Sequence, residues 1–348
     1  MSRTLAPARP AAAPAQRRPV GLRVTWAVGS VVLLALLVAL SVAVGARTVP
    51  LGDVVTALTG GGSGLDAAVV TQRVPRTVLA VLVGAALALA GAVMQGVTRN
   101  PLADPGLLGV SSGAALFVVV GITAFGLSSA TGYLVVAVAG SAVAATFVYA
   151  VGALGRGGAT PLKLALSGAA TSAALSSLVS AILLPRVDVM TRFRFWQIGG
   201  VGGASWDRIA VALPVLAAGA LLCLAMARGL NSLALGDDLA AGLGVHVRRT
   251  RLLAAAGAVV LAGAATAIAG PIGFVGLVVP HVVRTVVGSD HRWLLPLSAV
   301  GGSALLVLAD VVGRVVARPS EVDVGIVTAL VGAPFFVWIV RRRTVREL

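Results

Sequence analysis

Long apolar blocks with almost no charged residue inside them dominate the hydrophobic pattern of this 348-residue chain. Blocks of about 17 to 22 residues are long enough to cross the roughly 30 Å hydrocarbon core of a bilayer as helices. They lack the period-two alternation of barrel strands, so helices are the remaining way to satisfy their backbone hydrogen bonds in lipid. We therefore predict an all-α, polytopic membrane protein.

The blocks divide the chain into about ten transmembrane helices. We expect these spans at residues 26–45, 77–97, 107–127, 131–152, 162–184, 207–228, 251–270, 273–288, 294–313 and 324–340. The eighth block is the weakest, because it is short and contains Pro280. Residues 1–25 carry five arginines among prolines and alanines, which predicts a disordered basic cytosolic tail. Residues 26–343 then form one ten-span permease domain, with a possible surface helix between Arg47 and Arg76.

The distribution of basic residues orients these spans. An even number of spans places both termini on one side, and with the termini inside, the inner segments hold 18 of the 27 Lys and Arg residues. Since cytosolic loops carry the excess of Lys and Arg, both termini are predicted to be cytosolic. The chain is thus expected to be a multi-pass protein of a cell membrane, in contact with lipid.

Composition excludes several classes of function. Charged residues make up 11% of the chain, against roughly 25% in soluble domains. The net charge of +15 does not indicate nucleic acid, because the basic residues stand singly between apolar blocks without stacking aromatics. The three histidines are scattered without ligand spacing, and no serine or cysteine has a plausible base partner. We expect a solute transporter, with no enzyme activity and no bound metal.

The energy source of transport lies outside this chain. A phosphate-binding loop needs a lysine followed by serine or threonine, and the single lysine, Lys163, is followed by Leu164. We therefore expect no cofactor on this chain and no ATP site of its own. An ion-coupled carrier remains an alternative, although Asp310 is the only carboxylate inside a block. A receptor or scaffold is a further alternative, but it would need a cytosolic output domain.

The inner loop at 229–250 contains a short predicted helix. Asp237 is a suitable N-cap, and Gly244 can close the helix. Its apolar face can dock into the groove of a partner or rest on the membrane surface, and the residues alone leave both possibilities open.

Arginines at the outer ends of the blocks break the positive-inside trend. Arg73, Arg76 and Arg314 would form a basic outer rim that meets acidic residues of a soluble partner. Snorkelling of these side chains at helix ends is the alternative.

Small and hydroxylated residues form stripes on two blocks. Gly84, Ala88, Ala92 and Gly96 repeat every four positions along the second block, which favours close helix packing over a solute path. On the fifth block Ser167, Thr171, Ser172 and Ser176 share one face, where they would line the solute path or pack against a neighbouring helix.

The ordered set of motifs resembles the permease subunits of bacterial ABC importers for ferric siderophores, vitamin B12 and haem. The motifs are Arg73-Val-Pro-Arg76, Arg99-Asn-Pro-Leu-Ala-Asp-Pro-Gly-Leu-Leu-Gly-Val110, Gly236-Asp-Asp238, Gly270-Pro-Ile-Gly-Phe-Val-Gly-Leu-Val-Val-Pro-His281, Asp290-His-Arg292 and Gly332-Ala-Pro-Phe335. The resemblance implies the type II ABC importer permease fold in a bacterial inner membrane. It also implies a permease dimer, of two copies or two paralogues, with the path along its axis. The partners would be cytosolic ATPase subunits that use ATP and an extracytoplasmic binding protein.

The resemblance also implies roles for individual residues. The inner-loop helix looks like the coupling helix that the ATPase receives, with Leu235, Gly236, Asp237, Asp238, Ala241 and Gly244. Arg73, Arg76 and Arg314 match positions that receive carboxylates of the binding protein, and we expect the cytosolic gate near Thr160 and Pro161.

The cargo implied by the resemblance is an iron(III)-siderophore complex. The stretches Arg194-Phe-Trp-Gln197, Leu230-Asn-Ser-Leu-Ala-Leu235 and Asp290-His-Arg-Trp293 are closest to ferric-enterobactin-type permeases, which favours a catecholate. Cobalamin and haem are the alternatives. The stretch Glu321-Val-Asp-Val-Gly325 departs from the Glu-x-Pro-x-Gly form that is common in the family.

Overall fold

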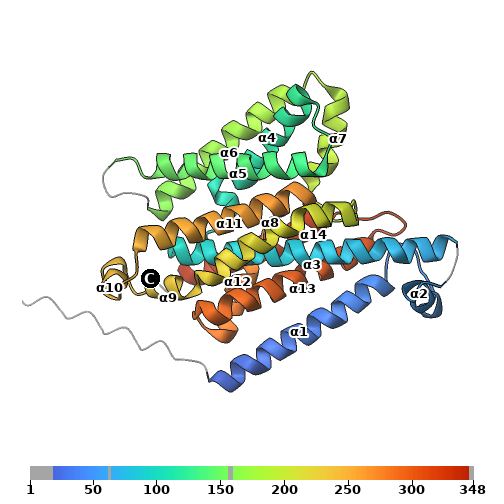
Figure 1. Ribbon diagram of the computed structural model, residues 1–348, viewed down its shortest axis with the longest axis horizontal. Coiled ribbons are helices and arrows are strands. Elements are labelled where there is room, and N and C mark those ends of the chain that lie inside the picture. The colour runs from blue at the N-terminus through green and yellow to red at the C-terminus, as the bar shows by residue number, and fades with distance from the viewer. Residues whose placement is uncertain (1–18, 62–63, 156–159, 345–348) are drawn as a thin grey trace, which may run out of the picture.

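The computed structural model describes residues 19–61, 64–155 and 160–344, and all regular structure in these ranges is helical (Figure 1). The elements are α1 (Val20–Ala43), α2 (Leu51–Leu58), α3 (Leu65–Thr98), the 3₁₀ helix η1 (Pro105–Leu108), α4 (Val110–Phe125), α5 (Ala130–Gly152), α6 (Pro161–Leu183), α7 (Val187–Ile198), α8 (Trp206–Ala225), α9 (Ala227–Leu233), α10 (Asp237–Gly242), α11 (Val247–Ala269), α12 (Val275–Val287), α13 (His291–Val316) and α14 (Val324–Thr344).

Each of the ten predicted spans coincides with a helix, which confirms the fold class. Seven of the described helices are long and apolar enough to cross a membrane, and α4, α12 and residues Val324–Trp338 of α14 are shorter apolar helices. The predicted start of the second span at residue 77 is wrong, because α3 begins at Leu65. The helix continues through Arg73 and Arg76 because other helices of the same chain supply partners for both charges, a carbonyl of α1 for Arg73 and Asp310 of α13 for Arg76.

Short helices occupy the connections between spans. The surface helix expected between Arg47 and Arg76 is α2. Two helices, α7 and α9, were not predicted; both are short, and α7 mixes charged with aromatic residues. Of the predicted tail, residues 1–18 lie outside the described residues, and the boundary at 25 is too late because α1 begins at Val20.

The helices form a bundle with two distinct ends. Figure 1 shows α10, the start of α1 and the end of α14 at one end, which we call the inner end. The end of α1, the start of α3 and α2 lie at the opposite end, which we call the outer end. Both ends of the described chain thus lie on one side, as the even number of spans requires.

The centre of the bundle is α3, which packs closely against α12 and α13. A Cβ atom on Gly84 would collide with the backbone of Gly302, and one on Gly91 would collide with the carbonyl oxygen of Gly276. Gly96 likewise lies against the ring of His291. The small-residue stripe on α3 is therefore a packing surface, as the sequence favoured.

The contact at Gly91 makes a prediction about stability. Gly91→Ala would overpack a helix crossing, at a cost of about 1–3 kcal/mol. We expect a clearly lower melting temperature of the detergent-solubilised protein. Gly29→Ala on α1 is the control, because nothing lies within 4 Å of its added Cβ. Equal melting temperatures for the two variants would contradict the close crossing.

Candidate functional site

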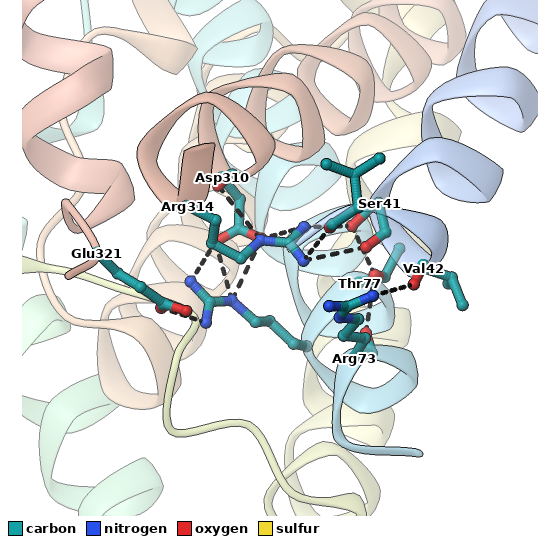
Figure 2. Close-up of polar contacts among 9 residues, drawn as sticks. Ser41, Val42, Arg73, Thr77, Asp310, Arg314 and Glu321 are labelled. Atoms are coloured by element: carbon teal, nitrogen blue, oxygen red, sulfur yellow. Dashed lines mark hydrogen bonds and ion pairs between the residues drawn. The ribbon is translucent and has the colours of Figure 1, made fainter. Parts of the chain in front are cut away.

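A cluster of charged side chains lies at the outer end between α3 and α13 (Figure 2). The guanidinium of Arg76 donates to Asp310 from Nε at 3.0 Å and from Nη2 at 2.8 Å. Its Nη1 donates to Glu321 at 2.6 Å. Arg314 pairs with the other oxygen of Asp310 at 2.9 Å, one helical turn further along α13. Asp310 is therefore neutralised from two sides, where a lone charge would be costly.

Three arginines of this end also bind backbone carbonyls at the C-terminal end of α1 and in the residues that follow it. Arg73 donates to the carbonyl oxygens of Val42, Ala43 and Arg47 at 2.6 to 3.1 Å. Arg314 donates to those of Ser41 and Val44, and Arg318 donates to that of Gly45. The last carbonyls of a helix lack partners within it and carry partial negative charge. The arginines satisfy these carbonyls and fasten α1 to α3 and α13.

This arrangement corrects the prediction of an exposed basic rim. Arg73 is 5% exposed and Arg314 is 2% exposed, so the prediction is wrong for both. Both side chains point into the subunit, where Arg73 binds carbonyls of α1 and Arg314 binds Asp310 and α1. The side chain of Arg76 keeps 14% exposure and reaches the surface beside Glu321. Docking of a partner's carboxylate stays a prediction, and Arg76 is the residue of the three with access to it.

The cluster also explains Asp310, the carboxylate inside an apolar block that kept an ion-coupled carrier as an alternative. Asp310 is 1% exposed and bound by two arginines, so it has no free oxygen facing a solute path. Its role in the structure is to hold the two cations between α3 and α13.

Asp310→Asn tests this role. The substitution leaves two partly buried cations without their shared carboxylate, and we expect a loss of about 3–5 kcal/mol in the free energy of unfolding. Glu321→Gln removes the charge of the other partner of Arg76. The side chain of Glu321 is 40% exposed, so the substitution should cost less than about 1 kcal/mol of the free energy of unfolding. Chemical denaturation in detergent measures both. Similar losses for the two variants would contradict a buried cluster centred on Asp310.

The predicted coupling helix is α10 at the inner end. Gly236, at φ 115°, occupies the N-cap position, so the prediction that Asp237 caps the helix is wrong. The Asp237 carboxylate instead accepts hydrogen bonds from Nη1 and Nη2 of Arg251, at 2.9 and 2.8 Å, and from Arg99. Two guanidinium groups bind a carboxylate more strongly than a backbone amide does.

Asp237 thereby joins three elements. Arg99 follows the last residue of α3 in a left-handed conformation, and Arg251 lies in the first turns of α11. Burial pushes the pKa of Asp237 upward, but the hydrogen bonds and charges of Arg251 and Arg99 outweigh it and hold the pKa below its ordinary value. The carboxylate stays ionised at neutral pH and ties α10 to the inner ends of α3 and α11.

Helix α10 and the residues on either side of it turn an apolar surface outward. Leu235, Leu239 and Leu243 are 58 to 64% exposed, whereas Ala240 is fully buried against the bundle. Asp238 and Ala241 are also exposed. Gly244, at φ 80°, follows the helix in the conformation that was predicted to close it. We call Leu235, Leu239 and Leu243 the leucine patch.

Hydrogen exchange tests the ion pairs of Asp237. Asp237→Asn should loosen α10, so that the amides of residues 238–243 exchange about fivefold faster, corresponding to ~1 kcal/mol for a partly exposed ion pair. Asp238→Asn is the matched control, since no ion pair of Asp238 occurs in the part of the chain that the structure describes. Unchanged exchange in Asp237→Asn would contradict the tie to α3 and α11.

The predicted gate and path residues lie on α6. The hydroxyl of Thr160 accepts from the Lys163 amide and caps this helix, which begins at Pro161. The Ser167 hydroxyl donates to the carbonyl of Val148 on α5 at 3.2 Å.

Thr171 and Ser172 of the predicted stripe also face the subunit. Thr171 is buried, and Ser172 lies close to Gly109, where an added Cβ would be 3.6 Å from its hydroxyl. The prediction of one shared face is wrong for Ser176, which is exposed on the side of α6 opposite to Ser167 because nine residues span two and a half turns. This placement favours the packing alternative for Ser167, Thr171 and Ser172. The gate role of Thr160 and Pro161 stays a prediction.

Several residues of both clusters were not singled out from the sequence. Ser41 and Arg251 carry no local signal of their role, and Glu321 was noted only as part of a motif because its partner Arg76 lies 245 positions away. Arg76 and Asp310, for example, are 234 positions apart. The position of Asp310 inside an apolar block was the one signal in the sequence, and it did not indicate which residues would pair with this carboxylate.

Comparisons with known proteins agree with this architecture. The FecCD transport family matches residues 33–342. The ferric enterobactin transport system permease protein FepD of Escherichia coli (strain K12) is 46% identical over 318 residues, which cover 91% of this chain and 95% of FepD. The hemin transport system permease protein HmuU of Yersinia pestis is 42% identical, with 78% and 82% covered.

Two further similarities concern another cargo and a solved structure. The cobalamin import system permease protein BtuC of Halobacterium salinarum (strain ATCC 700922 / JCM 11081 / NRC-1) is 47% identical over 281 residues, which cover 80% of this chain and 74% of BtuC. A metal-chelate type ABC transporter in an inward-facing conformation superposes with a TM-score of 0.77 at 28% identity, covering 92% of this chain and 99% of that chain.

Proposed function

We propose that this chain, which belongs to the FecCD transport family, carries a ferric siderophore through the bacterial inner membrane. At the coarser level it is the permease of an ABC importer of the iron-siderophore, haem or cobalamin type. The finer assignment to a ferric catecholate is the proposal. The arguments below concern the energy source, the cargo and the outer partner in turn.

The observation that carries the proposal is the leucine patch on α10. Three leucines that are 58 to 64% exposed form a docking surface at the inner end, and Asp237 fixes its orientation. The sequence contains no phosphate-binding loop, so ATP must act through another chain. An amphipathic helix that enters an apolar groove of an ATPase subunit fits both facts.

The similarity to FepD supports the cargo. The alignment with this ferric enterobactin permease covers more of both chains than those with the haem and cobalamin permeases do. The cobalamin permease is equally similar per residue, at 47% identity, so cobalamin is the second candidate cargo.

The remaining partners follow from the same assignment. A second permease, identical or paralogous, would complete the solute path, and a binding protein would deliver the cargo at the outer end. There Arg76 and Glu321 form the accessible part of the charged cluster. ATP drives transport when the ATPase binds one conformation of the permease more tightly than the other.

Uptake by bacteria that lack this chain tests the cargo. The complemented strain should import a ferric catecholate siderophore, and the empty strain should not. The panel includes a ferric hydroxamate, haem and cobalamin, each at the same concentration. Uptake of cobalamin without the ferric catecholate would replace the proposed cargo by the second candidate.

The leucine patch is tested in the same cells. Leu239→Asn combined with Leu243→Asn should abolish uptake and co-purification with the ATPase subunit, while the protein remains inserted in the membrane. Leu154→Asn is the matched control, because Leu154 is 69% exposed on another inner loop. Full uptake by the double variant, or uptake by the purified chain alone in vesicles with an ion gradient, would overturn the ATP-driven assignment.

A further inference from the structure

Helix α7 separates two cavities near the outer end of the bundle. A cavity of about 450 Å³ lies on its side towards α5, α8 and α11, and a cavity of about 320 Å³ lies on its side towards α6. Phe193 and Trp196 line both cavities, and their rings are 5.4 Å apart. A helix of only 12 residues cannot cross a bilayer, so α7 is a short helix placed between the spans (Figure 1).

The smaller cavity collects hydrogen-bonding side chains from three helices. Its polar lining consists of Ser111 and Ser112 of α4, Ser176 and Ser180 of α6, and Arg194 and Gln197 of α7. Ser172, one turn before Ser176, is near the middle of α6 and next to Gly109, which precedes α4. The cavity therefore extends from the outer half of α6 to α7, near the outer end of the bundle.

Arg194 has a weaker partner among the described residues than the arginines of the two charged clusters have. Its Nη2 lies 3.4 Å from the sulfur of Met190, a weak acceptor. No carboxylate among the described residues pairs with Arg194, whereas Arg76, Arg99, Arg251 and Arg314 each bind an aspartate. Arg194 is exposed and lines this cavity, so its guanidinium is accessible to an anion.

The chemistry of this lining matches one class of cargo. Iron held by catechol groups is bound through deprotonated oxygens, so the complex carries negative charge on an oxygen-rich face surrounded by aromatic rings. The guanidinium of Arg194, the amide of Gln197 and the hydroxyls of Ser111, Ser112 and Ser176 supply donors for those oxygens. Phe193 and Trp196 supply aromatic surface beside them. The volume lies at the small end of ligand pockets, as suits the contact of one face of a larger molecule.

We propose that the cavity between α4, α6 and α7 binds the anionic oxygen face of the iron chelate on its way through the membrane, with Arg194 as the anchoring cation. This inference rests on the proposed function and adds the residues that select the charge of the cargo. Ser176 and Ser180 extend the contact along α6, on the side of that helix opposite to the packed Ser167.

The experiment measures uptake of a ferric catecholate by bacteria whose only copy of this chain carries Arg194→Gln or Arg194→Lys. Loss of the cation should lower the uptake rate at least about tenfold, the size expected for one hydrogen bond to a charged group, and lysine should restore most of it. Arg186→Gln is the matched control, since Arg186 is an exposed arginine at the start of α7 that binds the Thr123 carbonyl and does not line the cavity.

Further readouts separate cargo binding from structure and from the proposed function. The melting temperature and the ATPase rate of the purified complex should be unchanged in Arg194→Gln, and Ser176→Ala with Ser180→Ala should lower uptake to a smaller extent. Wild-type uptake in Arg194→Gln, or equal losses of uptake and stability in the lysine and glutamine variants, would overturn the inference. Failure of the wild-type chain to import the ferric catecholate would instead count against the proposed cargo.

Discussion

The close crossing of α3 with α12 and α13 is the contact on which the rest of the structure depends. In lipid, helices gain little from burying apolar side chains against one another, so their association rests on close backbone approach and on polar contacts. Gly84 and Gly91 provide that approach at Gly302 and Gly276. With α3 held at the centre, its 34 residues form a rod of about 51 Å that reaches from the outer charged cluster to the inner loop.

Paired charges fix the two ends of this rod. At the outer end Arg76 and Asp310 join α3 to α13, and Arg73 binds the last carbonyls of α1. At the inner end Arg99, which follows α3, meets the carboxylate of Asp237 on α10. The outer pair is buried, where an unpaired ion is costly, whereas the inner pair is partly exposed and ties α10 to the end of α3. This explains why arginines that look available for a partner in the sequence are buried in the structure.

The sequence predicted the spans well and the sites only in part. Hydropathy and span length are local properties, so ten helices could be located, whereas α7 escaped because its apolar residues are interrupted by charges over only 12 positions. The function of a polar residue depends on what lies opposite it. The hydroxyl of Ser167 meets the Val148 carbonyl, and the carboxylate of Asp237 meets Arg251 rather than its own helix. Neither partner can be read from residue spacing.

The arrangement also connects the inner end to the outer end and leaves cavities on both sides of one short helix. The carboxylate of Asp237 connects α10 with Arg99 after α3 and with Arg251 on α11, so a displacement of α10 acts on both helices. Because α3 is closely packed along its length, it transmits the displacement to Arg76 at its other end. Helix α7 is anchored by Val189 and Phe193, which are buried in a hydrophobic cluster with residues of α4 and α6. Hydrogen bonds from Arg186 to Thr123 and from Trp196 to Ala267 hold it near its ends. Cavities lie on both sides of it, and Phe193 and Trp196 line both. A rearrangement of the surrounding spans therefore changes the space beside these two rings, next to the cavity that Arg194 lines.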